Sequence, residues 1–194
     1  SGGDEEGRLA PQPIHQMARR PQPPSERIEE PVVKELEALR CHEQSLDSEV
    51  LADGEVMPIA GVRGDGCELA IEIEGGAARR YGVKVRASPD GQEETLLYFD
   101  AETNQLVFDS TRSGKEGRKV IERAPFALKP GEPLKLRVFV DKSVVEIFAN
   151  DRQAIGRRVY PTRSDSLGLV LFATGGGAQF KTVKAWDMMP ANPY

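Results

Sequence analysis

The hydrophobic pattern has a period of two from residue 66 onward, and this period predicts an all-β domain. Cys67, Leu69, Ile71 and Ile73 alternate with polar or small residues, as in a strand with one buried face. Gly, Pro, Asn and Asp residues separate similar runs, so we expect roughly nine to eleven short strands, a number typical of an antiparallel β-sandwich or barrel. The further predicted strands cover residues 81–87, 95–100, 105–109, 134–140, 144–149, 153–159, 167–173 and 178–188.

Details of the pattern predict how some of these strands lie. Residues 66–74 carry acids and residues 81–87 carry bases on their polar faces, so pairing the two as a hairpin would set opposite charges across the strands. Residues 167–173 are apolar on both faces, as a central strand would be. The phase shift between Phe180 and Val183 predicts a β-bulge.

The region before residue 41 has a different composition. Residues 1–31 hold six of the 14 prolines, which lack a backbone donor and favour extended neighbours, so we interpret residues 1–30 as an extended arm. Val32, Val33, Leu36 and Leu39 share one face of a helical period. The expected organisation is therefore a Pro-rich arm (1–30), a short linker helix (31–40), a β-sandwich (41–190) and a tail (191–194).

The register of the hairpin near residue 141 can be predicted from the sequence. Aliphatic residues stand at even positions before the turn and at odd positions after it. A turn at residues 142–143 brings these two sets onto one face, because it pairs Val140 with Val145 and Val138 with Ile147.

The opposite face of this hairpin carries Arg137, Phe139, Glu146 and Phe148. Arg137 and Glu146 are diagonal neighbours, so we interpret them as an ion pair. Two phenylalanines beside a charged pair indicate that another surface covers this face. We therefore predict a domain or dimer interface here. The alternative is that this face is the interior of the sandwich and the aliphatic face is the covered one.

The strand region shows no set of residues that could carry catalysis. Hydrolysis of a glycoside normally requires two carboxylates about 5–10 Å apart, and only Glu146 stands in mid-strand among apolar residues. It could be a buried catalytic acid, but pairing with Arg137 is the favoured interpretation. The only histidines are His15 and His42, which excludes a Ser–His–Asp arrangement from residue 66 onward.

Metal and cofactor sites are not predicted either. Two cysteines, Cys41 and Cys67, form neither a disulfide framework nor a four-ligand metal site, although a single bridge between them stays open. The glycines at 175–177 precede a strand rather than a helix, so they indicate a turn and not a phosphate-binding loop. Trp186 and Tyr160 are candidates for stacking on a sugar ring, although core or interface packing is the commoner role of such side chains.

Charge and hydropathy limit the partners. The chain of 194 residues has a formal net charge of −5 and no basic run, which argues against nucleic acid and anionic membranes. No apolar run reaches the roughly 18 residues of a membrane span, and none opens the chain. We expect no signal peptide and no transmembrane segment in this chain, and the compartment stays open.

One long segment resembles a known family. The run LRVFVDKSVVEIFAND at residues 136–151 is similar to the signature of the C-terminal β-sandwich of glycoside hydrolase family 32, the β-fructofuranosidases, which include invertases, inulinases and levanases. The similarity continues through RVYP at 158–161 and LGLVLFATGG at 167–176. Residues 30–40 resemble the helix that links this sandwich to the catalytic β-propeller.

The resemblance implies a two-sheet, lectin-like jelly roll and a parent enzyme that hydrolyses β-fructosides such as sucrose, inulin or levan. The family's catalytic residues lie in the propeller, in motifs of the types NDPNG, RDP and EC, none of which occurs in this chain. We therefore expect a non-catalytic ancillary domain, without cofactor or metal, whose partner is the propeller. The alternatives are a fructan-binding module and a dimerisation domain that associates through Phe139 and Phe148.

Overall fold

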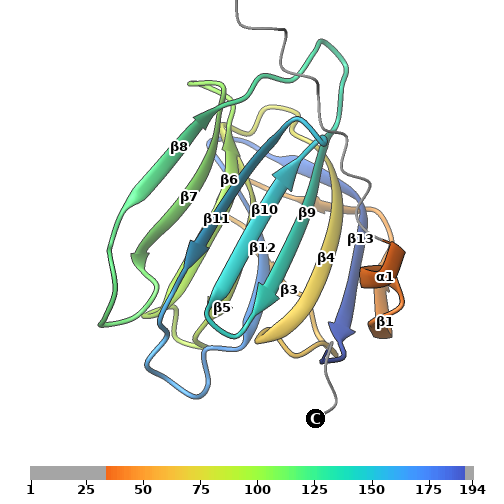
Figure 1. Cartoon of the computed structure of the whole chain (residues 1–194). Coiled ribbons are helices and arrows are strands. Elements are labelled where there is room, and N and C mark those ends of the chain that lie inside the picture. The colour runs from red at the N-terminus through yellow and green to blue at the C-terminus, as the bar shows by residue number, and fades with distance from the viewer. Residues whose placement is uncertain (1–33, 191–194) are drawn as a thin grey trace, which may run out of the picture. The chain divides into compact units, whose positions relative to one another are not determined.

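The computed structural model describes residues 34–190 and contains two antiparallel β-sheets packed face to face (Figure 1). The described residues belong to one compact unit, Pro31–Tyr194. The Pro-rich arm and the C-terminal tail of the sequence analysis lie outside the described residues. The predicted all-β sandwich is confirmed.

We refer to the seven-stranded sheet as sheet A. Its main path runs β1-β13-β4-β9-β10-β11, and β2 also pairs with β13. The strands of sheet A are β1 (Arg40–Leu46), β2 (Glu49–Leu51), β4 (Gly66–Glu74), β9 (Leu134–Asp141), β10 (Val144–Ala149), β11 (Gln153–Arg158) and β13 (Ala178–Met188).

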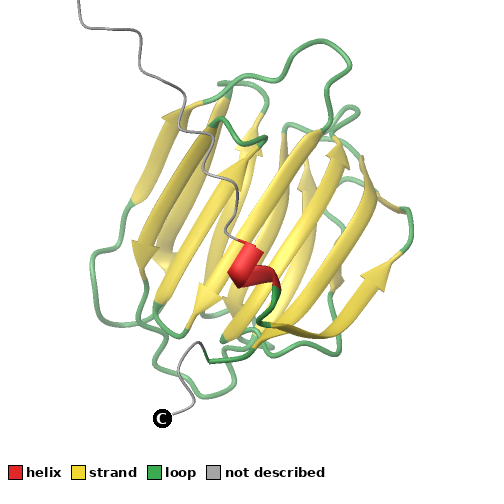
Figure 2. Ribbon diagram, turned by 45° about the vertical axis from the view of Figure 1, so that its right-hand side comes forward, coloured by secondary structure: helices red, strands yellow, loops and turns green. Residues whose placement is uncertain are grey.

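The six-stranded sheet, sheet B, follows the order β3-β12-β5-β6-β7-β8. Its strands are β3 (Val56–Pro58), β5 (Arg80–Ala87), β6 (Glu94–Asp100), β7 (Gln105–Arg112), β8 (Ile121–Pro125) and β12 (Gly168–Thr174). The only helix of the described region, α1 (Lys34–Glu37), has four residues and lies beside sheet A (Figure 2).

The core lies between the two sheets. It is built from the side chains at every second position of the strands, which point inward. Sheet A contributes the whole aliphatic face of β4 and the predicted aliphatic face of the β9–β10 hairpin. Sheet B contributes residues such as Leu97, Phe108 and Leu171, which are fully buried. The aliphatic face is therefore the interior, and the face with Phe139 and Phe148 is the outside of sheet A.

Local predictions from the alternating pattern are confirmed. Val140 pairs with Val145 and Val138 with Ile147, as the parity of the sequence positions requires. The pairing of β13 with β4 shifts register between Phe180 and Thr182, which is the predicted bulge. The glycines at 175–177 form the turn between β12 and β13, where Gly175 has a φ of 72°.

The proposed pairing of residues 66–74 with 81–87 is wrong. β4 pairs with β9 and β13 in sheet A, whereas β5 pairs with β6 and β12 in sheet B. The connection between them crosses from one sheet to the other, and Ala78 is buried in the core on the way. Alternation specifies which face of a strand is buried, but it does not specify the neighbouring strand.

The expected helix over 31–40 is shorter within the described residues, because β1 already begins at Arg40. A short isolated helix is marginal, and here the backbone of Leu39 accepts a hydrogen bond from Met189 at the end of β13. Strands β1, β2, β3 and β8 were not predicted. All four are edge or short strands that lack a long alternating run.

A disulfide between Cys41 and Cys67 is excluded. Both cysteines are free, and both stand opposite Asp187, which lies between them on β13. Two strand spacings separate their Cα atoms by about 10 Å, beyond the reach of a disulfide. Burial raises the pKa of the Cys67 thiol to about 12. As expected from its position, Cys67 acts as a small buried hydrophobic residue.

Candidate functional site

The outer face of sheet A brings together three of the four residues that the sequence indicated as an interface. Phe139 and Phe148 meet edge to face with ring centroids 6.1 Å apart, and the Arg137 guanidinium lies 5.2 Å from the centre of the Phe139 ring. These three side chains are only partly buried. We call this surface, Arg137 with Phe139 and Phe148, the aromatic face.

The centre of this side of the sheet is a residue that the sequence analysis did not single out. Glu68 lies on the outer face of β4, yet its side chain is completely buried. Its neighbours across the sheet are Trp186 on β13 and Phe139 on β9, so the carboxylate lies between two aromatic side chains.

Two arginines hold the Glu68 carboxylate. Arg40 donates from Nε to one oxygen and from Nη2 to the other, both at 2.8 Å, and Arg137 donates from Nε at 2.6 Å. Each arginine also stacks over an aromatic ring, Arg40 over Trp186 at 4.3 Å and Arg137 over Phe139. We call Arg40, Glu68 and Arg137 the arginine clamp.

The clamp attaches the linker to the sheet. Arg40 is the first residue of β1, shortly after α1, and Glu37 of α1 forms ion pairs of 3.6 Å with Arg40 and 3.9 Å with Arg137. The hydrogen bonds to the Glu68 carboxylate raise the pKa of Arg40, so its guanidinium stays charged. One charged network therefore fixes the point at which the chain enters the sandwich.

The predicted ion pair between Arg137 and Glu146 is wrong. Arg137 turns toward Glu68 instead, because the buried carboxylate needs the compensating charge more than an exposed one does. Glu146 is exposed on β10, opposite Phe139. An exposed carboxylate does not fit the alternative interpretation of Glu146 as a buried catalytic acid.

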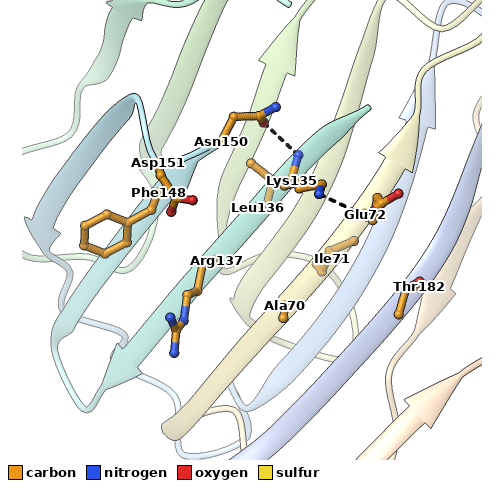
Figure 3. A pocket seen from close by; sticks show the side chains of 10 residues that line it. All are labelled: Ala70, Ile71, Glu72, Lys135, Leu136, Arg137, Phe148, Asn150, Asp151 and Thr182. Atoms are coloured by element: carbon orange, nitrogen blue, oxygen red, sulfur yellow. Dashed lines mark hydrogen bonds and ion pairs between the residues drawn. The ribbon is translucent and has the colours of Figure 1, made fainter. Parts of the chain in front are cut away.

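A shallow hollow of about 270 Å3 lies farther along the same face, over β4, β9 and β10 (Figure 3). Arg137 and Phe148 line one side of it, and Lys135, Asn150 and Asp151 line the end. The side-chain oxygen of Asn150 accepts a hydrogen bond from the backbone of Lys135 at 2.8 Å, which fixes the amide at the rim.

The two candidates for sugar stacking lie in different places. Trp186 is only 7% exposed, its Nε1 donates to Glu43 at 2.9 Å, and Arg40 covers its ring. In this arrangement the ring offers little surface to a sugar. Tyr160 is 42% exposed, on the loop that follows β11.

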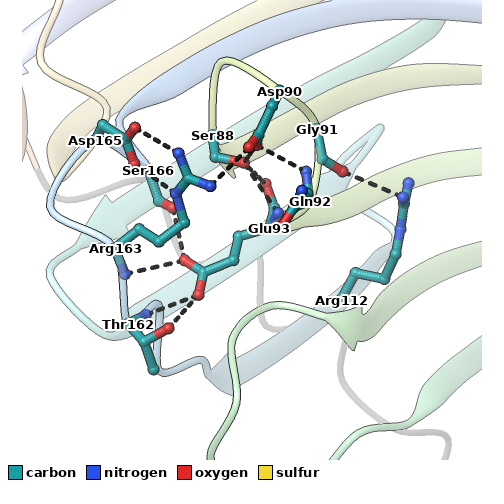
Figure 4. Close-up of polar contacts among 10 residues, drawn as sticks. All are labelled: Ser88, Asp90, Gly91, Gln92, Glu93, Arg112, Thr162, Arg163, Asp165 and Ser166. Atoms are coloured by element: carbon teal, nitrogen blue, oxygen red, sulfur yellow. Dashed lines mark hydrogen bonds and ion pairs between the residues drawn. The ribbon is translucent and has the colours of Figure 1, made fainter.

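A second polar cluster joins two loops at one end of sheet B (Figure 4). Glu93, just before β6, accepts hydrogen bonds from the backbone of Thr162 and Arg163 and from the hydroxyls of Thr162 and Ser166. Arg163 in turn bridges Asp90 and Asp165, each at 2.7 Å. The loop after β11 is thereby tied to the loop before β6.

Hydrogen bonds determine the ionisation of this cluster. Burial alone would raise the pKa of Glu93, but the donors of Thr162, Ser166 and Arg163 outweigh burial and lower it. The Ser88 hydroxyl, the Gln92 backbone and Arg163 lower the pKa of Asp90 to about 2. Both carboxylates are therefore charged near neutral pH.

Metal ligation has no candidate in the described part of the chain. No group of three His, Cys, Asp or Glu side chains within residues 34–190 could hold a metal ion. No helix among these residues is long and apolar enough to cross a membrane.

The two packed antiparallel sheets define the class of fold, a lectin-like β-sandwich. The family model for the C-terminal domain of glycosyl hydrolases family 32 matches residues 35–187. The chain therefore belongs to this family, as the resemblance of its sequence predicted.

Comparisons with individual proteins agree with this assignment. The sucrose-6-phosphate hydrolase of Zymomonas mobilis is 34% identical over 82% of this chain, and the levanase of Bacillus subtilis is 33% identical over 84%. The matches cover 31% and 26% of those two proteins, so the chain corresponds to about a third or less of their length.

Solved structures show the same fold. Fructan 1-exohydrolase IIa from Cichorium intybus superposes with a TM-score of 0.74 at 21% identity, covering 82% of this chain and 38% of that enzyme. A galectin from Caenorhabditis elegans superposes with a TM-score of 0.51 over 70% of this chain. The lectin-like character of the sandwich is thereby confirmed.

We predict that Glu68→Gln destabilises the domain by about 3 kcal/mol, because it leaves two partly buried arginines without their counter-charge. The free energy of unfolding in urea measures this loss. Glu72→Gln is the matched control, four residues along β4 on the same face. Glu72 pairs with Lys135 at 3.8 Å near solvent and is expected to contribute less than about 1 kcal/mol. Equal effects of the two substitutions would contradict the clamp.

We also predict a pH dependence from Glu93. Its pKa is lower in the folded chain than its ordinary value of 4.5, so the ionised carboxylate stabilises the fold above that value. This contribution is lost as the pH falls through the lower, folded pKa. Glu93→Gln should cost about 1–3 kcal/mol at neutral pH and flatten the decline in unfolding free energy between about pH 5.5 and pH 3.

Urea unfolding at a series of pH values measures this slope. Glu146→Gln provides the control, since Glu146 is exposed and makes no hydrogen bond to a described residue. A Glu93→Gln variant with the same slope as the original chain would contradict the assignment.

Proposed function

We propose that this chain is a non-catalytic ancillary domain that supports the catalytic β-propeller of an enzyme acting on β-fructosides. The observation that carries the proposal is the arginine clamp, which holds the linker beside the half-buried aromatic face. A domain that precedes the linker would emerge next to Phe139 and Phe148. Covering these rings would remove apolar surface from water, which stabilises an interface.

The relatives support the class of parent enzyme. Those described as sucrose-6-phosphate hydrolase, levanase and fructan 1-exohydrolase act on fructosyl compounds by name, and the present chain matches less than two fifths of each. We infer that the fructosyl-transferring residues belong to the propeller and that this chain supplies none of them.

A chimera tests this proposal. Residues 34–190 of this chain replace the matching segment of the Zymomonas hydrolase. We expect the chimera to hydrolyse its substrate and the isolated chain to show no turnover of sucrose, inulin or levan. Phe139→Ser with Phe148→Ser should lower the Tm of the chimera by several degrees more than the Tm of the isolated chain, because the rings are fully covered only when the propeller is present.

Two controls make the result specific. Tyr160→Ser removes an exposed aromatic ring elsewhere on the domain and should leave the chimera unaffected. An equal loss of Tm in the chimera and in the isolated chain would show that the rings stabilise the sandwich itself, and docking would be contradicted. Turnover by the purified isolated chain would contradict the non-catalytic role.

A fructan-binding role is the second candidate. The hollow in Figure 3 favours this role, because the aromatic side chain of Phe148 lies beside hydrogen-bonding groups of Arg137, Lys135 and Asn150. This combination is common in sugar sites. Tyr160 and Trp186 remain further candidates for stacking, and dimerisation through the aromatic face also remains a prediction.

Calorimetric titration of the isolated chain with fructose, inulin and levan tests this second role. Binding at the hollow predicts a millimolar or tighter affinity for inulin or levan that falls about tenfold in Phe148→Ala, because the ring face is lost. Ile121→Ala, which removes an exposed apolar side chain on β8 outside the hollow, is the matched control. The absence of heat at millimolar ligand, or an equal loss in both variants, would argue against sugar binding at this face.

A further inference from the structure

A second hollow, of about 570 Å3, lies at the end of sheet B, and its lining includes Glu93, Arg112, Thr162 and Arg163. Figure 4 shows the polar contacts of these four residues. The hollow is bordered by the end of β7, the loop that follows it and the loop after β11. Four of its lining side chains are cations, namely Arg112, Lys115, Lys119 and Arg163. This concentration of positive charge contrasts with the net charge of −5 of the whole chain.

Carboxylates neutralise two of these four cations, because Arg163 bridges Asp90 and Asp165 and Arg112 pairs with Glu94, but they leave Lys115 and Lys119 unmatched. Glu93 is occupied by its four donors from residues 162–166. The side chain of Glu94 is 3% exposed and forms ion pairs with Lys84 and Arg112. Lys115 and Lys119 are exposed and form no ion pair with any residue between 34 and 190. The hollow therefore presents unmatched positive charge to solvent.

The base of the hollow is preorganised. Glu93 holds the backbone of Thr162 and Arg163, so the wall formed by the loop after β11 is fixed before any ligand arrives. Gly114 has a φ of 134°, and a Cβ atom there would lie 2.0 Å from the carbonyl oxygen of Tyr160. The two loops thus pack directly against each other. A fixed site loses less entropy when it binds.

An aromatic ring stands beside the cations. Tyr160 packs against Gly117, where an added Cβ would lie 2.6 Å from the ring, and the tyrosine is 42% exposed. Gly117 belongs to the same loop as Lys115 and Lys119. A ligand held by the lysines could place an apolar ring face against Tyr160, the usual arrangement for sugar stacking.

We propose that this hollow binds a phosphorylated sugar. Lys115, Lys119 and the outward-facing part of Arg112 receive the phosphate, and Tyr160 receives the sugar ring. Lysine and arginine suit phosphate because they supply charge-assisted hydrogen bonds. The site is separate from the aromatic face, and the inference does not depend on the proposed support of a propeller.

Titration of the full chain with fructose 6-phosphate, inorganic phosphate and fructose, followed by amide NMR shifts, tests the site. We expect fructose 6-phosphate to bind more tightly than phosphate, and fructose to bind least. The shifts should fall on residues 111–119 and 162–163. The affinity should decrease as NaCl rises from 50 to 500 mM, because the contacts are ionic and near solvent.

Variants separate this site from general attraction of anions. Lys115→Gln with Lys119→Gln should weaken fructose 6-phosphate about tenfold. The matched control, Lys129→Gln with Arg158→Gln, removes the same charge from exposed positions outside the hollow and should have little effect. Tyr160→Ala should reduce the affinity for fructose 6-phosphate to that for phosphate.

Three results would overturn the proposal. The first is equal affinity for fructose and fructose 6-phosphate, which would indicate a neutral sugar site. The second is an equal loss in the hollow and control variants, which would indicate only long-range attraction. The third is the absence of shifts at residues 111–119 at 10 mM fructose 6-phosphate. None of these measurements involves the propeller, so failure here leaves the proposed function unchanged.

Discussion

A fully buried carboxylate on the outside of a β-sheet is stable only if charges and hydrogen bonds compensate it, and Glu68 satisfies this constraint with two arginines. The compensation determines more than local stability. Arg40 must lie where β1 begins, Arg137 must turn away from Glu146, and the rings of Trp186 and Phe139 must lie beneath the two guanidinium groups. The linker and the outer face of the sheet are therefore a single unit.

The sequence predicts the parts of the fold that depend on local alternation. The parity of aliphatic positions specifies the pairing of Val140 with Val145, and the loss of phase near Phe180 marks the bulge. Pairing between distant strands is not encoded in this way. β4 and β5 look like a charged hairpin, but the chain crosses between sheets at Ala78, and nothing in the alternation of either strand records that crossing.

The aromatic face was predictable and the clamp was not, for the same physical reason. Arg137, Phe139 and Phe148 lie within one hairpin, so the register of that hairpin places them together. Glu68 and Arg40 are 69 and 97 positions from Arg137, and only the order of strands β13, β4 and β9 brings them to it. In the alternating pattern of β4, Glu68 stands at a position where an exposed acid is expected. Its burial follows from partners on two other segments.

Separate parts of the domain therefore carry separate chemistry. On sheet A the charges neutralise one another, and the surface that remains is aromatic and suited to a protein partner. At the end of sheet B the carboxylates are used within the loops, and the surface that remains is cationic and suited to a small anion. Because loops tolerate substitution more easily than a packed sheet face, the anion site can change among related domains without disturbing the clamp. The two proposals require this independence, because they assign to one scaffold both the support of a catalytic partner and the binding of a charged ligand.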